Sequence, residues 1–117
     1  MSPNPPFINL SGASGAVYSY WKLDQPRKGA SMQSVGGNYV FLKQLANGNY
    51  LPVYVGQADD LSNRLPNHER FDDAIRAGAS VVVAHTTQAG ESARLSEERD
   101  LIAKWNPILN VHHRTIG

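Results

Sequence analysis

Residues 37–56 read GNYVFLKQLANGNYLPVYVG, and this stretch decides the fold. Two runs rich in β-branched and aromatic residues, Tyr39–Leu42 and Pro52–Val55, stand on either side of Asn47 and Gly48. Asn-Gly is the favoured pair for a two-residue hairpin loop, because both positions of that loop need a positive φ. The stretch therefore predicts an antiparallel hairpin that turns at Asn47 and Gly48.

The hairpin fixes how two tyrosines lie relative to each other. A turn at this pair places Tyr39 opposite Gly56 and Phe41 opposite Tyr54, so the two tyrosines are diagonal neighbours on one face. A slip of one residue would put them on opposite faces. Gly56 has no side chain and leaves room beside Tyr39 for a ligand. The two tyrosines are therefore either an aromatic pair packed in a core or part of a site.

Beyond the hairpin, the sequence predicts two helices, a strand and a third helix. Asp59 or Asp60 can cap the first helix, and Gly78 can end the second. Asn106-Pro107 ends the third, because proline cannot continue a helix. The order predicts an α+β fold, a small mostly antiparallel β-sheet flanked by helices. The predicted spans of these four elements are about 59–68, Phe71–Ala77, Ser80–Ala84 and Ser92–Trp105.

The N-terminal part is predicted to be an extension of this core. Within residues 1–35, Val17–Trp21 alternates as a strand does, between loops that contain glycine and proline. No internal repeat or low-complexity linker divides the chain. We expect a core over residues 36–117 and an extension, residues 1–35, that packs on it and offers one candidate accessory strand.

Composition narrows the class of protein. The chain has 117 residues, the length of one domain, and 41% of them are hydrophobic, which is enough for a core. It has no cysteine, so disulfides, thiolate metal ligands and cysteine nucleophiles are excluded. No apolar run approaches the roughly 20 residues that span a bilayer, and the first residues do not resemble a secretory signal. We expect a cytoplasmic protein.

The charge balance limits how the chain could bind nucleic acid. It carries 11 lysines and arginines against 10 aspartates and glutamates, a net charge of +1. A protein that holds a long duplex mainly by neutralising phosphates is normally more basic. The charge argues against a dedicated high-affinity nucleic-acid binder and leaves open an enzyme that contacts a few phosphates.

The first predicted helix carries Arg64 and His68 four residues apart, hence on one face. An arginine can donate two parallel hydrogen bonds to a phosphate, and a histidine can move a proton near neutral pH. A solvated helix face would explain the same pair.

The last helix places a carboxylate among apolar residues. At about 100° per residue, Glu98 falls in the middle of an apolar arc and Glu97 on its polar edge. A carboxylate in that position needs a partner, which could be Arg94 on the same helix or a hard cation such as Mg²⁺. After the helix, Asn110 ends an apolar run and could hydrogen-bond a nearby turn. The residues of the arc are Leu95, Leu101, Ile102 and Trp105.

Three stretches together resemble the GIY-YIG nuclease family. The first is Gly37-Asn38-Tyr39, and the second is Tyr54-Val55-Gly56, which runs on to Arg64 and His68. The third, from Glu98 to Asn110, is also similar to part of the nuclease domain of bacterial excision-repair enzymes. The resemblance covers about residues 36–110 in the family's order. Asn38 departs from it, since the family prefers an aliphatic residue there.

The resemblance implies a role for each matching residue. Glu98 would hold one Mg²⁺ or Mn²⁺ ion, and Arg64 would stabilise the charge that develops on the phosphorus centre. Tyr39 would help to activate the attacking water, with His68 assisting proton removal. The two remaining positions would act on geometry: Tyr54 would orient the water or the phosphate, and Asn110 would fix the local structure.

The function that follows is a metal-dependent endonuclease that hydrolyses DNA phosphodiester bonds, with one active site in each protomer. Its partner would be double-stranded or branched DNA, bound by a monomer or a dimer. The alternatives are a catalytically weak nucleic-acid-binding module of the same fold and a structure-specific nuclease of DNA repair or recombination. An active site requires the polar atoms of its residues to line one concave pocket that solvent can reach, and we predict such a pocket.

Overall fold

The predicted hairpin forms two adjacent strands of an antiparallel sheet. Strand β3 (Gly37–Gln44) pairs with strand β4 (Tyr50–Ala58). The structure is a computed structural model, and it describes residues 7–22, 36–61, 71–87 and 89–110.

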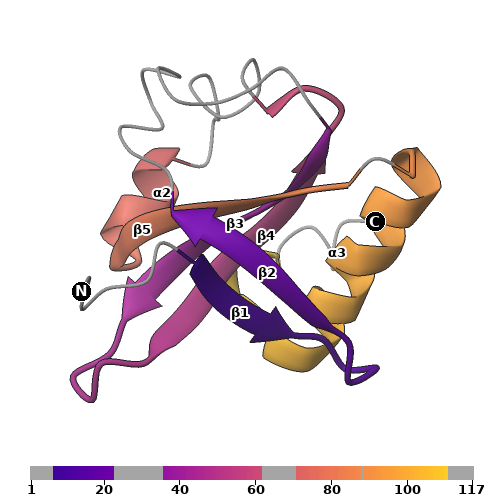
Figure 1. Ribbon diagram of the computed structural model, residues 1–117. Helices are drawn as coiled ribbons and strands as arrows, with labels where there is room; N and C mark the ends of the chain where they lie inside the picture. Colours follow the sequence, from indigo (N-terminus) through magenta and orange to yellow (C-terminus); the bar gives the residue numbers. More distant parts are fainter. Residues whose placement is uncertain (1–6, 23–35, 62–70, 88, 111–117) are drawn as a thin grey trace, which may run out of the picture.

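Three further strands complete the sheet. Strand β5 (Ala79–Thr86) pairs with the other side of β3, and β2 (Val17–Lys22) and β1 (Phe7–Ser11) follow beyond it. All neighbouring strands are antiparallel, in the order β1-β2-β5-β3-β4 (Figure 1). The α+β prediction is confirmed. The N-terminal extension contributes two strands, whereas the sequence offered one candidate.

The loop of the β3–β4 hairpin differs from the prediction. Leu45 N–H donates to the Asn49 carbonyl over 2.7 Å, so the loop between them has three residues, Ala46 to Gly48. Gly48 has φ +89°, while Asn47 keeps a negative φ and accepts a hydrogen bond from Asn49 N–H through its side chain at 2.9 Å. The predicted two-residue turn is therefore wrong, because one left-handed residue is sufficient for a three-residue loop.

The predicted pairing of the tyrosine strands is nevertheless confirmed. Tyr39 lies opposite Gly56 and Phe41 opposite Tyr54. A β-bulge between Phe41 and Leu42 places one extra residue, Val53, in β4 and shifts the register by one. The longer loop and the bulge change the register in opposite senses, so their effects cancel at the tyrosines.

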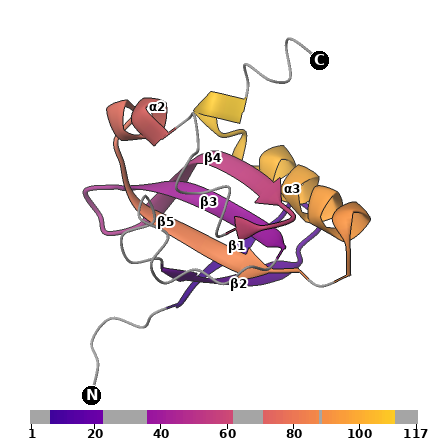
Figure 2. The same cartoon turned by 90° about the horizontal axis from the view of Figure 1, so that it is seen from above.

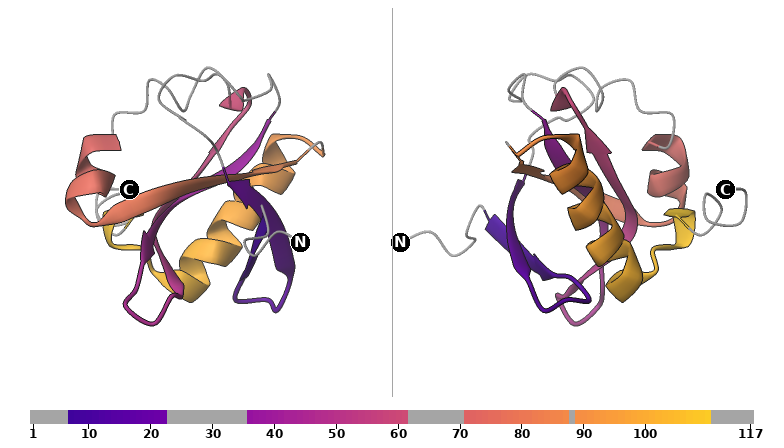
Figure 3. Two further views of the ribbon diagram at one scale, coloured as in Figure 1. Left: turned by 60° about the vertical axis from the view of Figure 1, so that its left-hand side comes forward. Right: turned by 90° about the vertical axis from the view of Figure 1, so that its right-hand side faces the viewer.

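Two helices pack on different sides of the sheet. Helix α2 (Phe71–Arg76) buries Ala74 against the face that carries Tyr39 and Tyr54. Helix α3 (Glu91–Trp105) buries Leu101 against the other face, among Val40, Val55 and Val83. Figure 2 shows the two helices well apart, and the right panel of Figure 3 shows α3 between β4 and the β1–β2 hairpin.

The helix boundaries follow the sequence signals. Helix α3 ends at Trp105, and Asn106 takes a left-handed conformation from which its N–H donates to the Ile102 carbonyl over 2.8 Å. Of the first predicted helix, the structure describes residues up to Leu61, which is helical. Residues 62–70 lie outside the described residues. None of the helices that the structure describes is long and apolar enough to cross a membrane.

Candidate active site

Tyr39 and Tyr54 lie on one face of the sheet, as predicted. Their ring centroids are 6.3 Å apart, and the ring of Phe41 is 5.9 Å from each of them. Tyr39 is 1% exposed and Tyr54 is 7% exposed, within the cluster that includes Leu61 and Ala74. The two tyrosines are therefore closely packed with other side chains on this face of the sheet. The pocket that the sequence predicts for them also involves Arg64 and His68, which lie outside the described residues, so it stays a prediction.

Gly56 accommodates one of these tyrosines. A Cβ atom at Gly56 would lie 2.5 Å from both Cζ and the hydroxyl oxygen of Tyr39. The sequence suggested that the missing side chain leaves room for a ligand. That prediction is wrong for the described residues, because the Tyr39 ring itself fills the space.

A second glycine is required by strand pairing. A Cβ atom at Gly37 would lie 2.1 Å from the carbonyl oxygen of His85 and 3.1 Å from Cα of Thr86, the residue paired with Gly37. A backbone contact of this kind cannot be relieved by turning a side chain. Glycine at the start of the first motif is thus a condition for the close approach of β3 and β5.

Asn110 binds the edge of the sheet. Strand β4 is the last strand in the order, so one side of its backbone has no neighbouring strand among the described residues. The Asn110 side chain accepts a hydrogen bond from Val55 N–H over 2.7 Å and donates one to the Val55 carbonyl over 2.9 Å. Asn110 therefore fixes the backbone between Tyr54 and Gly56, whereas the sequence suggested a contact with a turn.

Glu98 is half-buried on α3 and has no protein partner in the part of the chain that the structure describes. Arg94, the alternative partner, donates instead to the side-chain oxygen of Gln57 over 3.0 Å. Burial raises the pKa of the Glu98 carboxyl above its ordinary value, and the charge of Arg99 opposes that shift. A carboxylate in this position is destabilising by itself and would be favoured by a bound cation.

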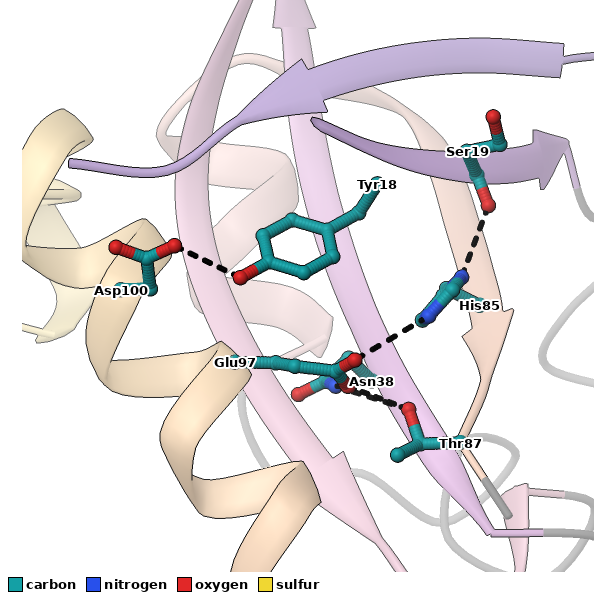
Figure 4. A network of polar contacts seen from close by, with 7 residues as sticks. All are labelled: Tyr18, Ser19, Asn38, His85, Thr87, Glu97 and Asp100. Atoms are coloured by element: carbon teal, nitrogen blue, oxygen red, sulfur yellow. Dashed lines mark hydrogen bonds and ion pairs between the residues drawn. The ribbon is translucent and has the colours of Figure 1, made fainter. Parts of the chain in front are cut away.

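Glu97 faces the sheet, which corrects its assignment to a polar edge. One carboxylate oxygen accepts hydrogen bonds from the Asn38 amide and from the Thr87 hydroxyl, the latter over 2.5 Å. The other oxygen is 3.5 Å from Nε2 of His85 (Figure 4). The helical periodicity assigned only apolar residues of α3 to the face that meets the core. The sheet under α3 offers polar side chains as well, and they turn Glu97 inward.

A second carboxylate of α3 binds the N-terminal hairpin. Asp100 accepts hydrogen bonds from the backbone N–H of Ser14 at 2.8 Å and from the hydroxyls of Ser14 and Tyr18 at 2.7 Å each. These bonds, that of the Ser14 hydroxyl first, hold the pKa of the Asp100 carboxyl below its ordinary value. Burial, with help from Asp100, raises the pKa of Tyr18 to about 12.

These contacts to α3 were not predicted from the sequence. Asn38, the departure from the family pattern, was the available signal, because a buried amide needs a polar partner. His85, Thr87, Tyr18 and Asp100 gave no signal, since their neighbours come from distant parts of the chain. Arg64 and His68 lie outside the described residues, and their roles stay predictions.

The described part of the site offers few protein ligands for a metal ion. Among the residues that the structure describes, no group of three or more histidines, aspartates or glutamates is placed to hold a metal ion. Mg²⁺ commonly binds proteins through one or two carboxylates, with water and substrate phosphates as the other ligands. The unpaired oxygens of Glu98 fit that mode of binding.

Comparison with solved structures identifies the fold. The chain is similar to the GIY-YIG N-terminal endonuclease domain of UvrC from Thermotoga maritima bound to magnesium, with a TM-score of 0.57 and 23% identity over 74% of this chain and 97% of that one. A point mutant of the same domain, bound to its catalytic divalent cation, gives a TM-score of 0.56 and 24% identity over 74% and 96%. No protein-family model matches the chain, and the search of curated proteins gives no match. The protein thus has the GIY-YIG endonuclease fold.

Proposed function

We propose that this protein is a metal-dependent endonuclease that hydrolyses phosphodiester bonds in DNA. The observation that carries the proposal is Glu98, a half-buried carboxylate with no hydrogen bond or ion pair to any residue of the described segments. Protein interiors normally provide such a group with a partner. The fold supports the same function, because the similar UvrC domain is an endonuclease bound to a catalytic divalent cation.

The metal ion would be Mg²⁺ or Mn²⁺, held by Glu98 together with oxygen atoms of the DNA phosphate. A bound divalent cation supplies positive charge where negative charge grows on the phosphate oxygens. The oxygen-only donor of Glu98 and the absence of cysteine from the chain match the preference of these ions for hard ligands.

The other site residues would act on the water and the phosphate. Hydrolysis forms a bond from the water oxygen to phosphorus and breaks the bond to the 3′ oxygen, which takes up a proton from solvent and leaves as a hydroxyl. Arg64 would donate to the phosphate oxygens, and His68 with Tyr39 would take the proton that the water loses. Tyr54 would orient the water, while Asn110 holds the strand between Tyr54 and Gly56.

The burial of Tyr39 favours a second candidate function. A tyrosine that is 1% exposed serves as a core residue unless the surrounding segment opens. A DNA-binding module that has kept the fold but does not cleave would retain such a tyrosine for packing. The two functions differ in whether Glu98 is needed for a chemical step.

Digestion of plasmid, branched and single-stranded DNA with Mg²⁺ tests the proposal. We expect cleavage by the wild-type protein, none by Glu98→Ala, and near-normal cleavage by Glu91→Ala. Glu91 is an exposed glutamate in the first turn of the same helix, so its removal changes the charge equally. Cleavage that is undiminished in folded Glu98→Ala would overturn the proposal. DNA binding without cleavage by the wild-type protein would establish the binding module instead.

A further inference from the structure

Polar side chains form a row on the face of the sheet that α3 covers. Asn38 of β3 is the register partner of His85 of β5, and the ring of Tyr20 in β2 lies 5.4 Å from the His85 ring. Tyr20 and Asn38 are fully buried. Helix α3 therefore packs on a surface that is polar where Glu97 meets it and apolar around Leu101.

Glu97 binds this row through Asn38 of β3 and through Thr87, the residue that follows β5. Its carboxylate accepts from the Asn38 amide and the Thr87 hydroxyl, and the Asn38 amide lies 3.4 Å from the same hydroxyl (Figure 4). These three side chains are mutually connected, and Asn38 and Thr87 are buried. The Asn38 Oδ1 atom is buried without a hydrogen-bond partner among the described residues, so the contacts of the amide nitrogen are the ones that hold these side chains in one geometry.

Asp100, one turn further along α3, binds the N-terminal β1–β2 hairpin. It binds Ser14 and Tyr18, and a Cβ atom at Gly12 would lie 2.0 Å from an Asp100 carboxylate oxygen, so the hairpin backbone packs directly on this group. Glu98 lies between the two bound carboxylates in the sequence and has no contact of its own among the described residues. Its direction is therefore set by the helix.

We propose that Glu97 is a positioning residue for Glu98, acting through Asn38 and Thr87. The inference rests on the proposed function, in which Glu98 holds the metal ion. Adjacent helix residues differ by about 100° in direction, so the contact that directs Glu97 to the sheet also fixes the direction of Glu98, about 100° around the helix from it. A helix rotation of about 20° would displace a side-chain head about 6 Å from the axis by about 2 Å. Metal and phosphate sites do not tolerate displacements of that size.

The contact between Glu97 and the sheet depends on the polar side chain of Asn38. An aliphatic residue at this position, as the family prefers, could not donate to Glu97. Asn38 and Glu97 thus form a matched pair in this chain, in which each satisfies a group that the other presents.

Direct binding of Mn²⁺ tests the proposal without relying on DNA cleavage. Free Mn²⁺ is measured by electron paramagnetic resonance during titration of the full chain, below the melting temperature of each variant. We expect Glu97→Ala and Thr87→Val to weaken Mn²⁺ binding by about tenfold, the lower end of the effect of losing a supporting contact at a metal site. Glu97→Gln should bind within about threefold of the wild-type protein, because its amide oxygen can still accept both hydrogen bonds.

Glu91→Ala is the matched control, because it removes the same charge from an exposed position of α3. Thr87→Val keeps the shape of the residue, so it tests the contact even if Glu97→Ala does not fold. The proposal would be overturned if Thr87→Val and Glu97→Ala both lost thermal stability but bound Mn²⁺ as tightly as Glu91→Ala does. If the wild-type protein and Glu98→Ala bind Mn²⁺ equally, the proposed metal site fails and the positioning role fails with it. If Glu98→Ala alone loses binding, only the positioning role fails.

Discussion

The clearest energetic consequence of the structure concerns Asn110. Replacing Asn110 by alanine removes both hydrogen bonds to the Val55 backbone, and no strand of the described sheet lies beyond β4 to replace them. Val55 is 0% exposed, so water does not reach its freed N–H and carbonyl groups without local opening. Each buried group left unsatisfied costs about 1–3 kcal/mol, so with two such groups we expect Asn110→Ala to lower the free energy of unfolding by about 2–6 kcal/mol.

Urea denaturation followed by tryptophan fluorescence measures this loss, and the slope against urea should stay unchanged. Asn9→Ala is the control, since Asn9 is an exposed amide that bonds only the exposed hydroxyl of Ser19, and it should change stability by less than about 0.5 kcal/mol. A loss below about 0.5 kcal/mol in Asn110→Ala would refute the account of the β4 edge.

Asn110→Asp separates the two hydrogen bonds. At neutral pH, the carboxylate still accepts from Val55 N–H but cannot donate to the Val55 carbonyl, so we expect a loss at least as large as that of alanine. Burial raises the pKa of a carboxyl in the folded state, and the protonated form can donate as the amide does. The stability of Asn110→Asp relative to the wild-type protein should therefore recover as the pH falls and be lost as it rises.

Three further predictions follow from the geometry and the charge. Gly56→Ala should cost about 1–3 kcal/mol in urea denaturation, because its Cβ atom would overlap the buried ring of Tyr39, and an unchanged midpoint would contradict this packing. The lowered pKa of Asp100 means that its contribution to stability is present above the ordinary aspartate pKa and lost as the pH falls through the folded value. The wild-type protein and Asp100→Asn should hence converge in acid, and a difference independent of pH would be inconsistent with the hydrogen bonds to Ser14. With a net charge of +1, DNA affinity should fall with salt at a logarithmic slope on the order of −2 to −4, and a slope near −8 would reveal a large basic surface.

The hairpin shows why the sequence predicts pairing better than loop geometry. Alternation of side chains ties Tyr39 and Tyr54 to one face once Tyr39 pairs with Gly56, and a slip of one residue would separate them. The Asn-Gly pair is compatible with both a two-residue and a three-residue loop, and local sequence does not distinguish them. The bulge at Val53 depends on how β4 pairs with Phe41 and Leu42 of β3, and no pattern within β4 alone indicates it.

The orientation of α3 could not be predicted from the helix alone. Periodicity assigns a core face by hydrophobicity, which is valid when the opposite surface is apolar. In this protein, β3 and β5 present Asn38 and His85 to the helix, and their meeting with Glu97 is set by the strand order β2-β5-β3. That order arises from contacts between distant segments, so the motif indicates candidate site residues but not the side chains that surround them.

The motif residues of this chain fall into two physical groups. Gly37, Gly56 and Asn110 are each explained by packing or backbone hydrogen bonds, and a protein with this fold and no activity would need them equally. Glu98 is different, because folding alone favours any uncharged residue at a half-buried position without a partner. An unliganded protein should therefore gain stability from Glu98→Gln at neutral pH, and divalent cation should stabilise the wild-type protein but not the variant. Thermal denaturation with and without Mg²⁺ decides this, and a wild-type protein that is the more stable of the two without metal would show that Glu98 has a structural role.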